Sequence, residues 1–560
     1  MSLDLQSLLD QARTWAALDP DPETKSQLEG IIAQAEAGDA AAAADLADRF
    51  SGTLQFGTAG LRAELGAGPM RMNRLVVQRA AQGLANYAKD RAKAEGWSKI
   101  SAVVGYDARK NSDIFALDTA AIFTAAGIEV LLMPSALPTP ITAWATREYG
   151  AELGVMVTAS HNPPQDNGYK VYLGGAAVEP GARGAQIVPP YDGQIAAAIA
   201  AVDRPVLAAE GWKLLPQSVA TDYINRVAPL VEQKERDLKI VLTPMHGVGG
   251  KTAEAVLHQA GFSQVTLVPE QAEPDPLFST VAFPNPEEPG ALDLALAEKI
   301  DADLIIANDP DADRAAFAVK REGTWAMLSG DETGAILATR LLPSLEKRAD
   351  ATFANSIVSS RLTGAIAAEA GIKHQETLTG FKWIARVENL TFGYEEALGY
   401  CVDHSQVRDK DGISAALLMA DYAAELKAQG SSFPALLDQL AQEHGLYATD
   451  QLSIRVDQLA QIPAMMQRLR SQAPSHLAGS AVSSVQDLSE GADGLPPTDG
   501  IRYYTQDSSR VIVRPSGTEP KLKCYLEVII PVTGSVSQAR AEAADRLAAL
   551  KADMREALGL

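Results

Sequence analysis

In Leu153-Gly-Val-Met-Val-Thr158-Ala-Ser160-His161-Asn-Pro-Pro164, an apolar run passes directly into a short polar loop. Residues 153–158 are typical of a buried β-strand, and the loop combines a hydroxyl and an imidazole with turn-forming residues. In an α/β sheet, chemistry gathers at the carboxyl ends of the strands, where such loops lie. Ser160 is therefore a candidate nucleophile, and the primary amine of Lys170 follows a few residues later.

Strands and helices alternate along most of the chain. The predicted strands of these blocks lie at 100–107, 129–133, 153–158, 239–242, 265–268, 303–307 and 352–358. Helices are predicted between them, at 115–126, after Pro140, up to Gln264 and at 361–369. Serial blocks of similar size predict repeated α/β domains.

The two ends of the chain differ from these blocks. Residues 1–50 are predicted to be helical, with a break at Asp19-Pro-Asp-Pro22, and to form an extension packed on the main body. Near the C-terminus, strands at 452–456, 500–505, 510–513 and 522–528 and a closing helix at 536–557 predict an α+β unit. Residues 471–500 are rich in Ser, Gly, Ala, Asp and Pro and are predicted to be a loop. The predicted divisions are 1–50, 51–205, 206–328, 329–448 and 449–560.

Composition limits the class of protein. A chain of 560 residues with 46% hydrophobic and 21% charged residues is an ordinary globular protein, too long for one core. No apolar run approaches the ~20 residues that cross a bilayer. No secretory signal is visible at the start, and two cysteines, Cys401 and Cys524, predict buried thiols in a reducing cytoplasm. A formal net charge of −22 argues against nucleic acid and anionic membranes as partners.

An acidic loop, Asp309-Pro-Asp311-Ala-Asp313-Arg314, follows a predicted buried strand. We expect an extended turn that directs three carboxylates to one side, which suits Mg²⁺ or Ca²⁺. An EF-hand is excluded, because Arg314 and Lys320 stand where its loop needs glycine and glutamate. A solvated acidic turn is the alternative. Mg²⁺ is favoured, since the neighbouring Arg314 can meet a phosphate oxygen.

Two glycine-containing loops raise the question of phosphate binding. His246-Gly-Val-Gly-Gly-Lys-Thr252 is not a nucleotide P-loop, because Met245 stands where that motif requires its first glycine. Arg514-Pro-Ser516-Gly517-Thr518 offers a guanidinium, two hydroxyls and converging N–H groups to an anion. A simple turn between strands would explain its small residues but not the arginine.

Further charged residues are candidates for ligand contacts. Glu395 and Glu396 lie between glycines and suit sugar hydroxyls, or else they begin a helix. Arg62 follows Phe56-Gly-Thr-Ala-Gly-Leu61 and could contact an anion, unless this is an ordinary loop. Lys382 and Lys410 are either ligand contacts or surface charges.

Taken together, these motifs resemble the α-D-phosphohexomutase superfamily, in particular its phosphoglucomutase/phosphomannomutase branch. The resemblance runs from about Phe56 to Tyr525, with motif order and spacing maintained. The opening Gly-Thr-Ala-Gly-Leu-Arg and the later Arg71-Met-Asn73 are most similar to phosphoglucomutase-2 and phosphopentomutase proteins. The resemblance implies an α/β fold of four domains around a central cleft, three of them related α/β units and the fourth a smaller α+β domain.

The resemblance also implies roles for the motif residues. Ser160 would carry a phosphoryl group, and its oxygen would join Asp309, Asp311 and Asp313 in holding Mg²⁺. Glu395 and Glu396 would bind sugar hydroxyls. The non-reacting phosphate would be bound by Arg514, Ser516, Gly517 and Thr518.

The implied reaction is the interconversion of sugar 1-phosphates and 6-phosphates, most simply those of glucose. A sugar 1,6-bisphosphate would be both the intermediate and the activator. Mannose and pentose phosphates, a Mg-dependent sugar phosphatase and a silent sugar-phosphate sensor remain alternatives. Neither the preferred sugar nor the oligomeric state follows from the sequence.

Proton transfer is the least defined part of this interpretation. Arg62 and Arg314 would neutralise charge, while Lys170 is the candidate general acid/base, with a pKa lowered by burial or cationic neighbours. Tyr400 stands where some relatives carry histidine, Ala397 replaces a common serine, and Ala63 replaces a common glycine. His161 is a weaker candidate for the second proton.

Overall fold

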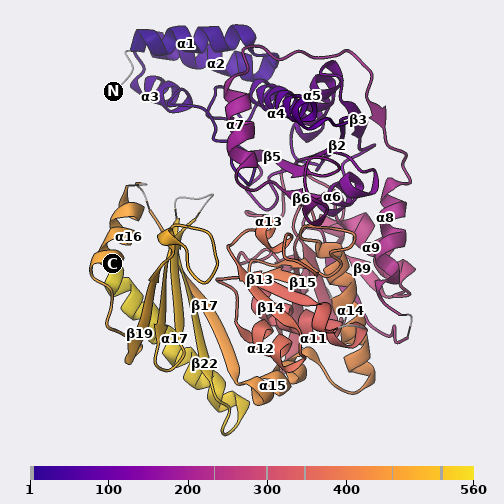
Figure 1. Cartoon of the computed structure of the whole chain (residues 1–560), viewed down its shortest axis with the longest axis vertical. Helices are drawn as coiled ribbons and strands as arrows, with labels where there is room; N and C mark the ends of the chain where they lie inside the picture. The colour runs from indigo at the N-terminus through magenta and orange to yellow at the C-terminus, as the bar shows by residue number, and fades with distance from the viewer. Residues whose placement is uncertain are drawn as a thin grey trace. The chain divides into compact units, whose positions relative to one another are not determined.

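The computed structural model describes residues 5–232, 234–297, 301–345, 348–456, 458, 460–516 and 521–560. The chain divides into two compact units (Figure 1). The first contains Met1–Met327 and Gly399–Ala424, and the second contains Leu328–Leu398 and Glu425–Leu560. In the part of the chain that is described, no helix is long and apolar enough to span a membrane.

The N-terminal region is helical, as predicted. It contains α1 (Leu5–Leu18), α2 (Pro22–Glu36) and α3 (Ala40–Arg49), drawn in indigo in Figure 1. The break before α2 is a helix start, because the Asp21 side chain accepts from the Glu23 N–H and Pro22 occupies the first turn. These helices share one hydrophobic core with the sheet that follows.

The first sheet has the strand order β1-β5-β4-β2-β3-β7, with β6 paired to β5. Its strands are β1 (Leu61–Glu64), β2 (Ser101–Tyr106), β3 (Glu129–Leu132), β4 (Leu153–Val157), β5 (Asp166–Leu173), β6 (Ala185–Gln186) and β7 (Lys213–Leu214). The strands β4, β2, β3 and β7 are parallel, whereas β5 runs antiparallel to both of its neighbours, β4 and β1. The helices of this block are α4 (Arg74–Glu95), α5 (Ser112–Ala125), α6 (Thr139–Glu148) and α7 (Tyr191–Ala200).

The second sheet has the order β12-β11-β10-β8-β9. Its strands are β8 (Ile240–Thr243), β9 (Val265–Leu267), β10 (Leu304–Asn308), β11 (Ala315–Arg321) and β12 (Thr324–Met327). The helices α8 (Val219–Val227), α9 (Gly250–Gln259) and α10 (Asp293–Ala297) accompany it. The first unit also takes in β16 (Gly399–Cys401) and the start of α14 (Gly412–Ala428).

The second unit begins with a third α/β block. Its parallel strands β14 (Lys373–Thr377), β13 (Thr352–Ser356) and β15 (Leu390–Glu395) lie in that order. The helices are α11 (Gly330–Leu341), α12 (Leu362–Glu369), α13 (Phe381–Ile384) and α15 (Phe433–His444). The three predicted α/β blocks are therefore present.

The C-terminal sheet is antiparallel, with the order β17-β22-β21-β20-β19-β18. Its strands are β17 (Leu446–Arg455), β18 (His476–Leu477), β19 (Ser480–Asp487), β20 (Ile501–Thr505), β21 (Arg510–Pro515) and β22 (Lys521–Ile530). The helices are α16 (Gln461–Ser471) and α17 (Val536–Leu558), which lies along the sheet in Figure 1. The α+β prediction is confirmed.

One prediction for this domain is wrong. Residues 471–500 are not a loop throughout, because they contain β18 and β19. The strand β19 is mostly half-buried and pairs with β20, so its serines can face solvent while its backbone joins the sheet. Cys401 and Cys524 are buried free thiols, as predicted.

Candidate active site

Ser160 lies in a strained loop directly after β4. It is 2% exposed and adopts a left-handed backbone conformation, with φ +52°, which is uncommon for a residue other than glycine. Its N–H donates to Thr158 Oγ1 at 2.8 Å. Such a conformation persists only where the surroundings hold it, and it is frequent at functional sites.

Arg109 supplies much of that support. Its Nη2 donates to the carbonyl oxygens of Ser160 and Asn162, both at 2.6 Å, and its Nη1 donates to that of Pro163 at 2.8 Å. The Arg109 side chain is fully buried, and its Nε lies 3.4 Å from Asp107 Oδ2. Both residues follow β2, at the same edge of the sheet. Our sequence analysis missed Arg109, although an Asp-x-Arg at the carboxyl end of a strand was a usable signal.

The three aspartates form a compact, fully buried group between β10 and β11. Asp309, Asp311 and Asp313 are each 0% exposed, and their candidate ligand oxygens lie within 4.8 Å of one another. The loop is not extended as predicted, because the Ala312 N–H donates to the Asp309 carbonyl at 2.8 Å and closes a tight turn. The solvated alternative is also wrong.

The chemistry of this group fits a divalent cation. Asp311 Oδ1 and Asp313 Oδ1 are buried and have no hydrogen-bond partner among the described residues, which is costly for a carboxylate unless a cation lies beside it. Hard carboxylate oxygens are ligands that Mg²⁺ prefers. These residues could therefore hold a metal ion.

The Ser160 hydroxyl belongs to the same group. It donates to Asp309 Oδ2 at 2.8 Å, while the Arg314 N–H donates to Asp309 Oδ1 at 2.9 Å. Thr139 Oγ1 donates to Asp311 Oδ2 at 2.6 Å. Loops after β4 and β10 thus bring the candidate nucleophile into direct contact with a candidate metal ligand, as the sequence analysis expected.

Lys170, on β5, lies against two of the aspartates. Its Nζ donates to Asp311 Oδ2 at 2.7 Å and to Asp313 Oδ2 at 2.8 Å. Burial lowers the pKa of Lys170, but these two carboxylates outweigh that effect and leave it above its ordinary value. The expectation of a lowered pKa is wrong, because it considered cationic neighbours and not the anionic ones.

The contacts with Lys170 also make the pKa values of the three aspartates differ. Burial raises the pKa of all three aspartates, and Asp309 stays well above its ordinary value beside Asp311 and Asp313. For Asp311 and Asp313, the ammonium of Lys170 reverses the effect and lowers the pKa. The contact with Lys170 therefore distinguishes Asp311 and Asp313 from Asp309.

Lys410 is part of this site and is not a surface charge. It is 8% exposed, and its Nζ lies 3.1 Å from Asp313 Oδ2 and 3.6 Å from Asp409 Oδ1. Its stem passes close to Gly399, where a Cβ would lie only 2.3 Å from the Lys410 Cδ. A glycine is thus required there for Lys410 to reach the aspartates.

Arg62 contacts the loop that contains Ser160, and His161 is part of that loop. Arg62 is on β1, so the alternative of an ordinary loop is wrong for this residue, and its Nη1 donates to Asn162 Oδ1 at 3.2 Å. His161 Nδ1 lies 3.3 Å from Ser160 Oγ. Burial, together with the charges of Arg314 and Arg62, holds the pKa of His161 well below its ordinary value. Its imidazole is therefore neutral at neutral pH.

The glycine loop before α9 supports the aspartate loop. The Val248 N–H donates to the Pro310 carbonyl at 2.9 Å. A Cβ on Gly247 would lie 2.4 Å from Pro310 Cα, so the two backbones meet where only glycine fits. The loop joins β8 to α9 as a tight turn, as predicted, but its link to the site was not foreseen.

Glu395 and Glu396 lie in the second unit, at the end of β15 and in the turn after it, so the alternative of a helix start is wrong. Glu395 Oε1 accepts from the Gly380 N–H at 2.7 Å. Glu396 Oε2 accepts from Ser359 Oγ at 2.9 Å and from Ser356 Oγ at 3.1 Å.

The remaining predicted residues lie in this unit or in β16. Lys382 is half-buried in α13, and Arg514 and Ser516 are half-buried at the end of β21. Gly517 and Thr518 lie outside the described residues. Tyr400, where some relatives carry histidine, is fully buried in β16.

Comparison with protein families accounts for most of the chain. Four family models match in order: phosphoglucomutase/phosphomannomutase domain I over 53–202, domain II over 221–323, domain III over 329–444 and the C-terminal domain over 453–529. The order of these matches follows the order of the four sheets.

The alignments with curated relatives cover nearly the whole length of those relatives. The chain is 45% identical to a probable phosphomannomutase of Haemophilus influenzae over 468 residues, covering 82% of this chain and 93% of the relative. It is 34% identical to the phosphopentomutase of Mus musculus, covering 94% and 92%. It is 36% identical to a phosphoglucomutase of Staphylococcus haemolyticus, covering 87% and 93%.

Solved structures share the fold. A putative phosphomannomutase from Thermus thermophilus superposes with a TM-score of 0.68 at 22% identity, covering 89% of this chain and 99% of the other. The open form of Paramecium parafusin, a phosphoglucomutase, superposes with a TM-score of 0.68 at 20% identity, covering 90% and 96%.

Proposed function

The chain belongs to the phosphoglucomutase/phosphomannomutase family and is a phosphosugar mutase, and from this premise we propose that it interconverts glucose 1-phosphate and glucose 6-phosphate. A phosphoserine at Ser160 would exchange its phosphoryl group with the sugar through a glucose 1,6-bisphosphate intermediate, which also serves as activator. The observation that carries the proposal is the 2.8 Å contact between Ser160 Oγ and Asp309 Oδ2 inside a buried group of carboxylates and cations.

We propose that Mg²⁺ is bound by Asp309, Asp311, Asp313 and an oxygen on phosphorylated Ser160. The ion would neutralise negative charge on the transferring phosphoryl group. Asp311 Oδ1 and Asp313 Oδ1 support this proposal, since both are buried, accept no hydrogen bond from a described residue and could bind the ion.

The cationic residues of the first unit receive complementary roles. Arg62 and Arg314 would stabilise the charge of the phosphoryl group, and Lys410 would contact the substrate. Lys170 is an ammonium in this structure, so it can neutralise charge and donate a proton to a departing oxygen. Neutral His161, beside Ser160 Oγ, is the second candidate for proton transfer.

The second unit is proposed to bind the rest of the substrate. Glu395 and Glu396 would accept hydrogen bonds from sugar hydroxyls, and Lys382 would contact the sugar phosphate. The non-reacting phosphate would be bound by Arg514, Ser516, Gly517 and Thr518. The half-buried placement of Arg514 at the end of a strand supports this role. We also propose a cytoplasmic location, which the free thiols of Cys401 and Cys524 support.

The sugar is the part of the proposal that relatives leave open. Pentose phosphate is a second candidate, because relatives named phosphopentomutase and probable phosphoribomutase align over 93% or more of this chain. Mannose phosphate is a third, because of the Haemophilus relative. We expect the highest kcat/KM with glucose 1-phosphate in a panel of glucose, mannose, ribose and deoxyribose 1-phosphates with glucose 1,6-bisphosphate present. A higher value for another sugar would reassign the substrate.

Replacement of the nucleophile tests the reaction itself. Ser160→Ala should abolish isomerisation of glucose 1-phosphate while leaving the thermal unfolding temperature nearly unchanged. Inorganic phosphate release comparable with isomerisation in the unmodified enzyme would instead indicate a phosphatase. Full activity of Ser160→Ala would rule out the phosphoserine pathway.

A further inference from the structure

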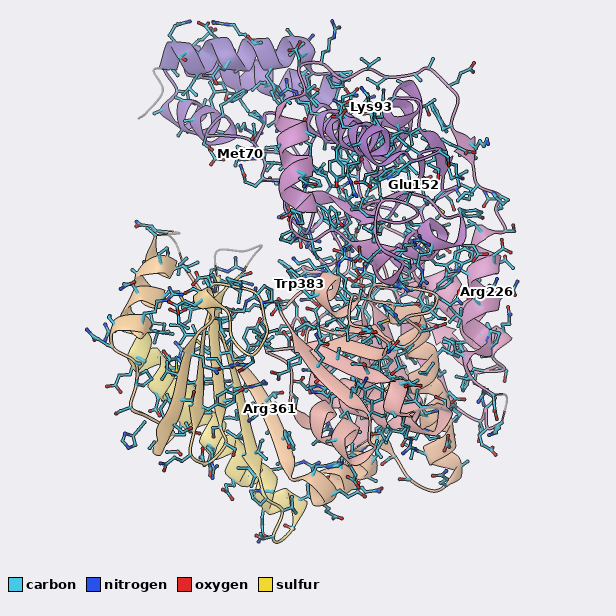
Figure 2. The ribbon with its side chains drawn as sticks, viewed as in Figure 1. Met70, Lys93, Glu152, Arg226, Arg361 and Trp383 are labelled. Carbon is cyan, nitrogen blue, oxygen red and sulfur yellow. The ribbon has the colours of Figure 1, made fainter. Side chains whose placement is uncertain are left out.

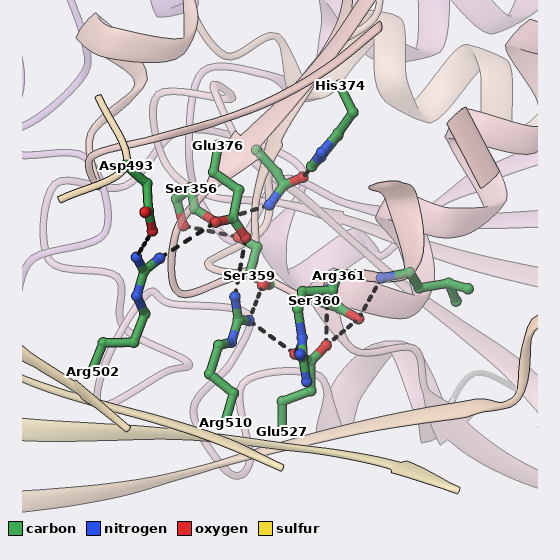
Figure 3. A network of polar contacts seen from close by, with 12 residues as sticks. Ser356, Ser359, Ser360, Arg361, His374, Glu376, Asp493, Arg502, Arg510 and Glu527 are labelled. Carbon is green, nitrogen blue, oxygen red and sulfur yellow. Dashed lines mark hydrogen bonds and ion pairs between the residues drawn. The ribbon is translucent and has the colours of Figure 1, made fainter. Parts of the chain in front are cut away.

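A buried polar network joins the third α/β block to the C-terminal sheet inside the second unit (Figure 3). Its centre is the segment Ser356–Arg361, here called the serine loop, which follows β13 and leads into α12. The side chains of Ser356, Ser359 and Ser360 are 2% exposed or less. Buried hydroxyl groups in folded proteins almost always have a hydrogen-bond partner.

On one side, the serine loop holds Glu396. Ser359 Oγ accepts from the Glu396 N–H at 3.1 Å and donates to Glu396 Oε2 at 2.9 Å. Ser356 Oγ lies 3.1 Å from the same Oε2 and 2.9 Å from Ser359 Oγ. A hydroxyl can donate one hydrogen bond and also accept others. Ser359 therefore holds the carboxylate of Glu396 by donating and its main chain by accepting. All of these contacts to the carboxylate use Oε2.

On the other side, strands of the C-terminal sheet hold the serine loop. Arg510, on β21, donates through Nη2 to the Ser359 carbonyl, and the same nitrogen lies 3.1 Å from Glu527 Oε2. Glu527, on β22, accepts from Ser360 Oγ at 2.9 Å and from the Arg361 N–H at 2.8 Å. Figure 3 shows these groups converging on the loop.

The ion pair at the base of this network is fully enclosed. Arg510 is 2% exposed and Glu527 is 1% exposed. Burial opposes both charges, yet the attraction of Glu527 raises the pKa of Arg510, and Arg510 with Arg361 lowers that of Glu527. Buried pairs contribute little net stability, but they permit few alternative geometries when every partner is present. The serine loop is therefore held in one position from the C-terminal sheet.

We propose that Ser356 and Ser359 are positioning residues for sugar recognition. They fix Oε2 of Glu396 and its main chain, so that Oε1 is left in one orientation for a sugar hydroxyl. Arg510 acts through the Ser359 carbonyl to hold the serine loop in register. This proposal rests on the proposed role of Glu396 as a ligand of sugar hydroxyls and names the residues that set its geometry.

Serine-to-alanine variants of the full chain test the proposal. Ser359→Ala, and separately Ser356→Ala, should raise the KM for glucose 1-phosphate by about tenfold, the value of one charge-assisted hydrogen bond. The kcat should change by less than about twofold, because a contact kept in ground and transition states affects KM alone.

Ser101→Ala is the matched control. Ser101, at the start of β2, is 3% exposed and donates through Oγ to Glu152 Oε2 at 2.9 Å, while its N–H donates to the same oxygen at 2.7 Å. Glu152, labelled in Figure 2, belongs to the first unit and directly precedes β4, at the opposite end of that strand from Ser160. The control reports what the loss of a buried Ser–Glu hydrogen bond does to stability, and its KM should not change.

A double-mutant cycle separates positioning from a general effect on folding. In a Glu396→Ala background, Ser359→Ala should add no further increase in KM, because the group that it positions is gone. An equal increase in both backgrounds would overturn the proposal, as would an unchanged KM in Ser359→Ala and Ser356→Ala. If Glu396→Ala itself leaves KM unchanged, the assignment of Glu396 in the proposed function fails first.

Discussion

Among single residues, Arg109 and Asp107 connect the stability of the first unit to Ser160, the candidate nucleophile. Arg109 satisfies four main-chain carbonyls of the loop that contains Ser160, namely those of residues 160, 162, 163 and 166. Its charge is balanced inside the protein by Asp107. The left-handed conformation of Ser160 is thus held by a cation that does not need to touch substrate.

Arg109→Ala is expected to destabilise the enzyme by about 3–5 kcal/mol, because it leaves Asp107 buried without its partner. The variant should also lose most of its kcat, since the Ser160 loop can relax out of its strained conformation. Urea unfolding and steady-state kinetics measure the two effects.

An exposed ion pair serves as the control for the loss of the buried Arg109–Asp107 pair. Lys213 and Glu129 form an exposed ion pair at 2.7 Å, so Lys213→Ala should cost only about 0–1 kcal/mol. An Arg109→Ala variant no less stable than Lys213→Ala would contradict the role given to the buried pair.

Sequence motifs located the candidate reacting groups but not the groups that hold them. Ser160 and the three aspartates carry chemistry in their own side chains, and their spacing is legible. Arg109 donates to main-chain carbonyl groups, which every residue has. The residues that accept these hydrogen bonds therefore share no recognisable sequence pattern. The sign of the pKa shift at Lys170 was also inaccessible, because it depends on aspartates 141 and 143 residues further along the chain.

At the scale of elements, two loops from neighbouring strands of the second sheet support one another. The loop after β8 donates an N–H to the aspartate loop after β10, and its Gly247 leaves room for Pro310. Strand periodicity predicted both loops within a residue or two. Their contact could not be predicted, because it depends on parallel pairing of strands far apart in the sequence.

Gly247→Ala should therefore displace the aspartate loop. The added Cβ meets backbone atoms of Pro310, which cannot rotate away, so we expect a loss of about 1–3 kcal/mol of stability. We also expect a higher Mg²⁺ concentration for half-maximal activity, and a smaller rise in unfolding temperature when Mg²⁺ is added.

Gly30→Ala provides the control, since a Cβ at Gly30 in α2 meets nothing within 4 Å. That change should be neutral or stabilise the chain by up to about 1 kcal/mol. If both variants keep the same Mg²⁺ response, the aspartate loop is not supported by Gly247 in the way described.

The strand β19, next to the edge of the C-terminal sheet, shows where element prediction failed. The strand β19 has serines and half-exposed valines in place of a continuous apolar run, so its composition resembles a loop. Its backbone is nevertheless fixed by pairing with β20. A strand and a loop of this composition differ only in whether a neighbouring strand pairs with them, and no local sequence pattern reveals that neighbour.

In the molecule as a whole, the chain forms two units, and each unit contains buried polar and charged side chains within its interior. In the second unit, Asp331 at the start of α11 accepts from the Ser360 N–H at 2.7 Å and from Thr449 Oγ1 of β17 at 2.7 Å. Burial raises its pKa to about 7, helped by the nearby carboxylates of Glu396 and Glu527. Asp331 therefore joins the α/β block to the C-terminal sheet with a group that titrates near neutral pH.

The raised pKa predicts a slope in stability with pH. The folded state holds the Asp331 proton up to about pH 7, whereas the unfolded chain releases it near 3.8, so the folded state binds more protons between these values. This contribution is complete below about pH 4 and is lost as pH rises through 7. Urea unfolding from pH 5 to 8 measures the slope.

Asp331→Asn isolates this contribution. The amide can accept from Ser360 and donate to Thr449 Oγ1, so the contacts persist without a titrating proton. The difference in stability between the two proteins should shift in favour of the variant as pH rises from 5 to 8. A constant difference over that range would show that Asp331 is ionised throughout.

We propose that Ser160 carries the phosphoryl group between the two ends of the sugar. The sharpest test is intact-mass measurement with peptide mapping after incubation with glucose 1,6-bisphosphate and Mg²⁺. We expect a gain of one phosphoryl group located on Ser160, discharged when excess glucose 1-phosphate is added, and absent in Ser160→Ala. The proposed role of Ser160 fails if the enzyme isomerises glucose 1-phosphate without acquiring that group, or acquires it on another residue.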